Sequence, residues 1–177
     1  MRRITACAAA ATMSVALGAV AAPAAAAKDQ PFRASMSGWT AVGEGAFDGD
    51  VADRCREVSG PGVSVTTLEG TGTASHLGRV SVWTEYCVHG TTGVYGDGEL
   101  RLTAANGDAL VGTFSRGQSY WIDEPAGVLG FVDELVFGPG GTGRFSSASG
   151  GGVESGSYDV ATGDWTLEIT GVLDKRG

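Results

Sequence analysis

Period-two alternation of apolar and polar residues recurs along most of the chain, and it constrains the fold more than any other feature. In the first such segment, Phe32, Ala34 and Met36 alternate with polar residues. This pattern is typical of strands that bury one face. The 30 glycines are spread through every segment, and glycine in a helix interior costs about 1 kcal/mol relative to alanine. We therefore predict an all-β domain.

The alternation and the turn residues between its segments predict eight strands. Their ranges are 32–43, 63–76, 78–89, 93–104, 109–116, 128–137, 144–160 and 165–173. We expect a loop over 117–127, and a tight turn over 138–143 that lets Phe145 plug one barrel end. Asn106 and Gly107 predict a type I′ hairpin turn, because both residue types tolerate a positive φ.

The short predicted connections favour hairpins between consecutive strands and hence an up-and-down antiparallel arrangement. Eight strands can close into a barrel, which removes the exposed edges that invite aggregation. Glycines inside the strands favour the curvature that closure needs. We therefore predict an eight-stranded antiparallel β-barrel, with a two-sheet β-sandwich as the alternative.

The start of the chain predicts export. Two arginines are followed by small apolar residues over 4–22, then by Pro23 and four alanines. This order is typical of a secretory signal peptide and predicts cleavage after Ala27. A membrane anchor is the alternative, and the proline and small residues argue against it. We predict a signal peptide over 1–27 and a single β-barrel domain over 28–177, secreted to the extracellular space and not inserted in a membrane after processing.

Two cysteines remain after that cleavage, Cys55 and Cys87. An even number of cysteines in an exported chain predicts a disulfide bond. A loop of this length is worth roughly 3–4 kcal/mol in the chain-entropy model. The competing interpretation is a catalytic pair of Cys87 with His89, because alternate residues share one face of a strand.

Three short motifs resemble a known family. They are Gly70–Arg79 (GTGTASHLGR), Leu102–Asp108 (LTAANGD) and Gly140–Phe145 (GGTGRF). In order and spacing they resemble bacterial proteins similar to allene oxide cyclase, and the last resembles the glycine turn of dirigent proteins. The resemblance implies an eight-stranded barrel, often trimeric. It carries over no catalytic residues, and the segment around Cys55 departs from it.

Charge and motifs exclude several function classes. Residues 1–27 hold two of the 12 basic and none of the 20 acidic residues, so the processed chain has a net charge of 10 − 20 = −10. Such a chain repels nucleic acid.

We expect no cofactor or metal. The glycine-rich turn lacks the lysine and helix of a phosphate loop, and two histidines are too few for zinc once the cysteines are paired.

One acidic residue stands on an apolar strand face. Asp133 shares its parity with Leu129, Phe131, Leu135 and Phe137. A carboxyl group in such a place needs a partner or a raised pKa. The partners we consider are Arg79, Arg101 and Tyr158.

The other face of the same strand is apolar too, because it carries Val132 and Val136. We therefore expect burial on both sides, with Asp133 or Glu134 inside the barrel near Phe131, Leu135 and Trp165. A buried ion pair and a catalytic acid both remain open for this group.

Three functions are compatible with these features. The first is binding of a small apolar ligand in the barrel or at its mouth. Its expected lining is Leu100, Leu102, Leu110, Phe114, Phe131 and Trp165. The second is an enzyme of the cyclase or dirigent kind that steers a reactive intermediate, with Asp133 or Glu134 as acid–base group. The third is a structural or interaction protein with a filled barrel, and cavity volume separates it from the first.

Overall fold

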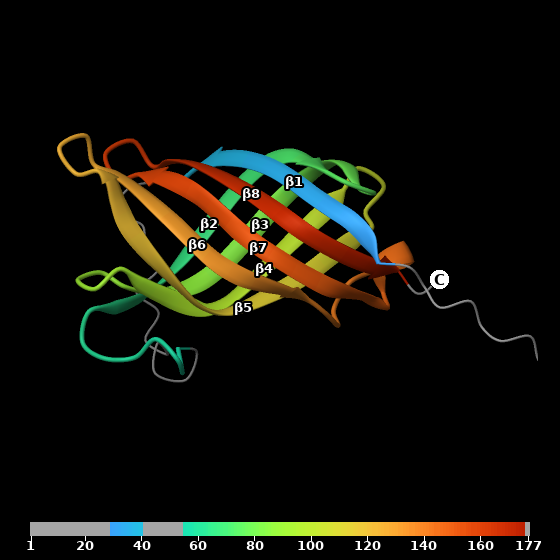
Figure 1. Ribbon diagram of the computed structural model, residues 1–177, viewed down its shortest axis with the longest axis horizontal. Helices are drawn as coiled ribbons and strands as arrows, with labels where there is room; N and C mark the ends of the chain where they lie inside the picture. Colours follow the sequence, from blue (N-terminus) through green and yellow to red (C-terminus); the bar gives the residue numbers. More distant parts are fainter. Residues whose placement is uncertain (1–28, 41–54, 176–177) are drawn as a thin grey trace, which may run out of the picture.

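Eight strands close into an antiparallel barrel in the computed structural model, which describes residues 29–40 and 55–175 (Figure 1). The strands are β1 (Gln30–Trp39), β2 (Val63–Ala74), β3 (Gly78–His89), β4 (Val94–Ala104), β5 (Ala109–Asp123), β6 (Val128–Phe137), β7 (Ala148–Asp159) and β8 (Asp164–Lys175). Each pairs with the next, and β8 closes on β1. The predicted barrel is confirmed and the sandwich is wrong. The predicted signal peptide, residues 1–27, lies outside the described residues.

Along the strands, the alternating apolar residues face the barrel interior, as predicted. Phe32, Ala34 and Met36 of β1 are buried, while the polar residues between them are exposed. Burial of such side chains is worth about 1.5–3 kcal/mol each and drives closure of the sheet around one core. Among the described residues, no helix is long and apolar enough to cross a membrane.

Phe145 fills one end of the barrel, as predicted. It lies in a single 3-10 turn, Gly143–Phe145, seen as the short orange helix at the right of Figure 1, and is fully buried. The side chain of Thr142 accepts a hydrogen bond from the backbone N–H of Ala109 at 2.9 Å, which ties the turn to β5. Because these residues form the plug, β7 begins at Ala148 and not at the predicted residue 144.

The hairpin between β4 and β5 differs from the predicted type I′ turn. Gly107 has a φ of +88°, but Asn106 is not among the described residues with positive φ. The N–H of Gly107 donates to the carbonyl of Ala104 at 2.9 Å, and the N–H of Ala104 donates to the carbonyl of Asp108 at 2.9 Å. This is a three-residue loop in which glycine alone takes the left-handed conformation.

Strand β5 extends to Asp123, so the predicted loop over 117–127 is wrong for 117–123, and the turn between β5 and β6 covers only 124–127. Residues Gln118 and Ser119 pair with Val132 and Phe131 of β6, which prolongs the hairpin beyond a register shift between Thr113 and Gly117. Pairing with the apolar start of β6 continues the strand through these residues.

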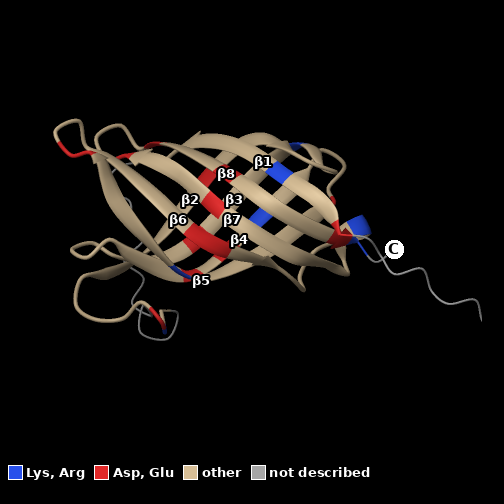
Figure 2. Cartoon of the chain, in the orientation of Figure 1, with Lys and Arg blue, Asp and Glu red and all other residues tan. Residues whose placement is uncertain are grey.

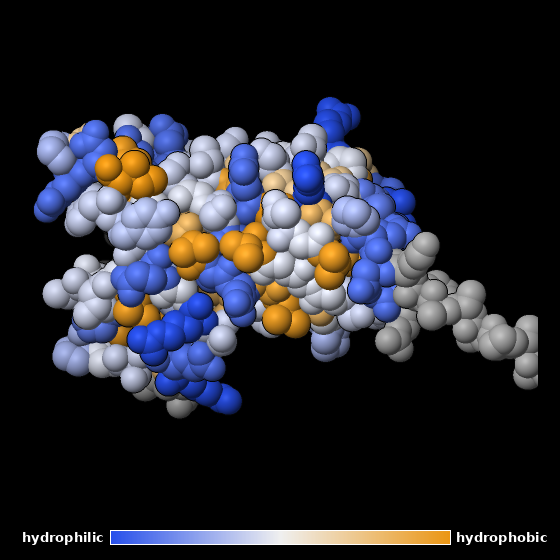
Figure 3. Space-filling model, viewed as in Figure 1, coloured by the Kyte–Doolittle hydropathy of each residue, from blue (hydrophilic) through white to orange (hydrophobic). Residues whose placement is uncertain are grey.

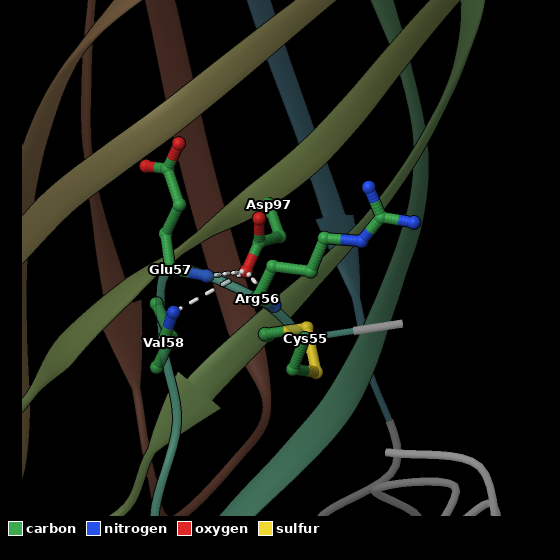
Figure 4. The surroundings of a disulfide bond; sticks show 6 residues. Cys55, Arg56, Glu57, Val58 and Asp97 are labelled. Carbon is green, nitrogen blue, oxygen red and sulfur yellow. Dashed lines mark hydrogen bonds between the residues drawn. A yellow bond between two sulfur atoms is a disulfide. The ribbon is translucent and has the colours of Figure 1, made fainter. Parts of the chain in front are cut away.

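A disulfide bond holds the segment before β2 against the outside of the barrel. Cys55 is bonded to Cys87 of β3, as predicted, with the two Cα atoms 5.7 Å apart. Beside it, Oδ2 of Asp97 accepts the backbone N–H groups of Arg56 and Glu57 at 2.8 Å and of Val58 at 3.2 Å (Figure 4). The bond removes the thiol that a Cys87–His89 catalytic pair would need.

The outer face of β6 and its neighbours is exposed. Val132 and Val136 are 43% and 59% exposed, so the expected burial of β6 on both sides is wrong. Val153 of β7 and Val172 of β8 are also exposed, and Figure 3 shows apolar side chains on this face. A barrel has one interior, and here nothing among the described residues covers the outside of these strands.

Candidate functional site

A cavity of about 190 Å³ occupies the half of the barrel away from Phe145. Its lining residues are Thr66, Leu68, Thr84, Tyr86, Val88, Tyr95, Phe114, Ser119, Leu129, Phe131, Glu154, Tyr158, Trp165 and Leu167. Most belong to the strand ends that carry the β5–β6 and β7–β8 hairpins, at the left of Figure 1. In Figure 3 this end is notched between two lobes. One end of the barrel is therefore filled and the other is hollow.

Strand glycines leave room for the aromatic side chains of the cavity. A Cβ atom on Gly117 would collide with the ring of Tyr95, and one on Gly156 would collide with the ring of Phe131. The indole of Trp165 lies in the same way over Gly38 and Gly70. Each ring lies across a neighbouring strand that has no side chain beneath it, an arrangement that stabilises strand glycines. The glycines thus shape the cavity wall as well as the curvature.

Two carboxyl groups lie side by side in this half of the barrel. Asp133 of β6 is paired in register with Glu154 of β7, and the two residues are only 5% and 4% exposed. Directly opposed residues on antiparallel strands have Cβ atoms about 5 Å apart. Figure 2 shows acidic residues next to one another in the middle of β6, β7 and β8. Glu154 borders the cavity directly, and Asp133 lies beside it.

Tyr95 is the partner of Asp133. Its hydroxyl donates a hydrogen bond to Oδ2 of Asp133 at 2.7 Å. Within the described part of the chain, Asp133 makes no hydrogen bond or ion pair with the predicted partners Arg79, Arg101 and Tyr158. The predicted ion pair of Asp133 is therefore wrong, and a neutral phenol stands in its place.

A β-bulge brings Tyr95 inside. Asp97 has a φ of +50°, and the pairing of β4 with β3 shifts by one residue at this point. The shift reverses the parity of the strand, so Tyr95 faces inward together with Leu100 and Leu102. Regular alternation would have placed Tyr95 outside. The same Asp97 holds the disulfide segment, which links the outer brace to the inner site.

The surroundings favour the protonated forms of both carboxyl groups. Burial raises the pKa of Asp133 from its ordinary 3.8 to about 6, although the Tyr95 hydrogen bond acts to lower it. Burial raises the pKa of Glu154 well above its ordinary value, and the charge of Asp133 raises it further. Burial is also the main cause that raises the pKa values of Tyr86, Tyr95 and Tyr158, so these phenols stay neutral.

Several polar atoms of the site lack hydrogen-bond partners among the described residues. They are Thr84 Oγ1, Asp133 Oδ1, Glu154 Oε2 and Trp165 Nε1. Thr84, Glu154 and Trp165 line the cavity and are all less than 5% exposed. An unpaired buried polar atom costs about 1–3 kcal/mol. Such a cluster around a cavity makes this half of the barrel the candidate binding or catalytic site.

Of the two acidic candidates from the sequence, one lies inside the barrel and the other faces solvent. Asp133 lies inside the barrel as expected, near the cavity wall formed by Phe131 and Trp165. Glu134 points to solvent, so it is wrong as an interior or acid–base candidate. The reason is strand parity: in the single-layered wall of a barrel, two successive residues cannot both face inward.

Three of the six predicted lining residues border the cavity, and the other three lie in the filled half of the barrel. Phe114, Phe131 and Trp165 line the cavity. Leu100, Leu102 and Leu110 also face inward, but they are fully buried in the filled half and do not border the cavity. Alternation identifies the inward face. It carries no information on how far along the axis the space stays open.

Sequence reasoning missed Tyr86, Tyr95 and Glu154, and it named Tyr158 only as a possible partner of Asp133. Glu154 shares its parity with Gly156 and Tyr158, and that pattern was a usable signal for an inward carboxyl. Among the described residues, no three His, Cys, Asp or Glu side chains come together as metal ligands. The site therefore consists of one carboxyl pair within a wall of phenols and apolar side chains.

Comparison with known proteins adds no relative. No protein-family model matches the chain, and neither does any curated protein or solved structure. The resemblance to allene oxide cyclase and dirigent barrels stays a prediction, for which the eight-stranded barrel is the implied architecture.

Proposed function

We propose that the protein binds a small, mainly apolar molecule in the open half of its barrel. The observation that carries the proposal is the cavity of about 190 Å³ with unpaired polar atoms of Thr84, Glu154 and Trp165 in an otherwise apolar and aromatic wall. Ligand sites are concave, mostly apolar and equipped with a few polar groups that orient the ligand. A protein with a purely structural role gains nothing from a cavity or from unpaired polar atoms, since both reduce stability.

We also propose that this binding takes place outside the cell. The signal-like start of the chain supports export, and the Cys55–Cys87 disulfide is compatible with an oxidising compartment. Binding of a small molecule requires no second copy of the chain, so the trimer implied by the family resemblance is a separate prediction.

The test uses 2-phenylethanol as the probe and titration calorimetry as the measurement. Val88 lines the cavity, so Val88→Phe fills part of it. Val132 is 43% exposed on the outer face, so Val132→Phe is the matched control. We expect the unmodified protein and the control to bind the probe, and Val88→Phe to bind it at least about tenfold more weakly. No binding by the unmodified protein, or equal binding by Val88→Phe, would refute the proposal.

A second candidate is an enzyme that steers a reactive intermediate, as the family resemblance implies. One observation favours it: Glu154 borders the cavity, and burial raises its pKa well above the ordinary value, which suits a group that donates a proton. In that case Glu154→Gln abolishes turnover but leaves binding of 2-phenylethanol intact. Asp133 would act on the proton affinity of Glu154, while Glu134 would play no part.

A further inference from the structure

The cavity offers a ligand negative charge and aromatic rings, and no positive charge. Glu154 lies in its wall with Asp133 beside it. Among the described residues of the lining, none is a lysine, an arginine or a histidine. Six of the lining residues are aromatic: Tyr86, Tyr95, Phe114, Phe131, Tyr158 and Trp165.

We infer that the ligand is a small organic cation, an ammonium group carried on an apolar body, with the ammonium group against Glu154 and the aromatic rings around it. This inference rests on the proposed function and specifies the class of its ligand. It concerns the same cavity, whose wall supplies both the carboxyl group and the aromatic rings that the ligand needs.

The carboxyl pair carries the first argument. Two buried carboxyl groups on adjacent strands cannot both ionise at low cost unless a positive charge joins them. Tyr95 supplies Asp133 with one neutral donor, and Oε2 of Glu154 has no donor among the described residues. An ammonium group supplies charge and N–H donors together, and such charge-assisted hydrogen bonds are about twice as strong as neutral ones. A neutral ligand would not offset the repulsion between the two ionised carboxyl groups.

The aromatic wall carries the second argument. The ring of Tyr95 lies 5.7 Å from Tyr86, 6.0 Å from Phe114 and 6.4 Å from Phe131, measured between centroids, so the four rings form one cluster. Ring faces attract cations, and the attraction is stronger where water is excluded. An anionic ligand would meet the same rings and the carboxyl pair with repulsion.

The volume limits the size of the ligand. A cavity of about 150 Å³ lined by apolar side chains takes up benzene. The cavity of about 190 Å³ therefore accommodates one six-membered ring with a short arm. The arylalkylamine 2-phenylethylamine has this size, and 2-phenylethanol and phenylacetate are its neutral and anionic counterparts.

The inference also implies a pH dependence with a definite sign. The titratable groups that face the cavity or adjoin it are Asp133, Glu154, Tyr158, Tyr86 and Tyr95, while the lining from β2, β5 and β8 contributes none. The three phenols stay neutral, and the pKa of Asp133 is about 6, so the carboxyl pair gains negative charge between about pH 5 and about pH 8. Because the ionised pair attracts the ammonium group, affinity for the amine rises with pH over this range, whereas affinity for the alcohol does not.

The experiment titrates the three matched compounds into the unmodified protein, Glu154→Gln, Asp133→Asn and the exposed control Glu134→Gln, by calorimetry at about pH 7.5 and about pH 5. We expect the unmodified protein to bind the amine about tenfold more tightly than the alcohol at the higher pH, and phenylacetate most weakly. Glu154→Gln should lose this preference but keep the alcohol, and Glu134→Gln should keep both. If Glu154→Gln does not fold, Asp133→Asn and the pH series of the unmodified protein provide the test.

The outcomes separate the two proposals. Binding of the alcohol with equal or weaker binding of the amine overturns the cation inference and leaves the proposed function standing. A preference for the amine that survives in Glu154→Gln and in Asp133→Asn also overturns it, because the charge would then act elsewhere. Failure of all three compounds to bind overturns both.

Discussion

Replacing Asp133 by asparagine should stabilise the protein at neutral pH and not in acid. Asp133 is 5% exposed, and burial raises the pKa of its carboxyl group from 3.8 to about 6. The folded protein therefore holds this proton more tightly than the unfolded chain. Stability then falls as the pH rises from about 3.8 to about 6, because the unfolded state releases the proton first.

The size of the effect follows from the same pKa values. A pKa that rises from 3.8 to about 6 on folding costs about 3 kcal/mol once the group is ionised. The asparagine variant lacks this cost, and Tyr95 can still donate to its amide oxygen. Removing the charge of Asp133 also relieves Glu154, whose pKa the charge raises. At pH 4 more than half of the unfolded chains are already ionised at this position, so the advantage of the variant should be about 2.5 kcal/mol larger at pH 7.5 than at pH 4.

The assay is urea denaturation at a series of pH values between these limits, with free energies of unfolding from linear extrapolation. Comparing the two pH values cancels any pH-independent effect of the substitution on hydrogen bonding. Glu134→Gln is the matched control, because Glu134 is the exposed neighbour on the same strand and should show no such trend. An advantage that changes by less than about 1 kcal/mol across the series would refute the burial of an ionisable group at Asp133.

Three further predictions concern the fold and its processing. Gly107→Val should lower the free energy of unfolding by about 1–2 kcal/mol, because Gly107 has a φ of +88°; urea denaturation of the variant tests this, and an unchanged midpoint contradicts it. Thiol labelling of the denatured, unreduced, processed protein should find Cys55 and Cys87 protected, and replacing both by serine should cost roughly 3–4 kcal/mol; two reactive thiols would exclude the bond. Intact-mass measurement of the exported product should give a chain beginning at Lys28, and a product that retains residues 1–27 would exclude cleavage there.

The strands and the plug could be predicted because their signals are local. Alternation and turn residues locate β3 and β6 with the bounds that the structure has, Gly78–His89 and Val128–Phe137. The parity of β6 also places Asp133 inside. Errors arose where pairing overrides local preference, as in the extension of β5 to Asp123, and where the interior is confused with a second buried face, as for Val136.

The amino-acid sequence by itself determined which residues face inward along each regular strand, since the side chains of a strand alternate whatever their partners. Only the tertiary structure decided what those residues meet. Register placed Glu154 beside Asp133, and the bulge at Asp97 turned Tyr95 inward to reach a carboxyl group 38 residues away. Phe145 closes one end, while the other keeps its cavity. Pairing, bulges and filled volume depend on contacts between distant segments, and local periodicity carries no information about them.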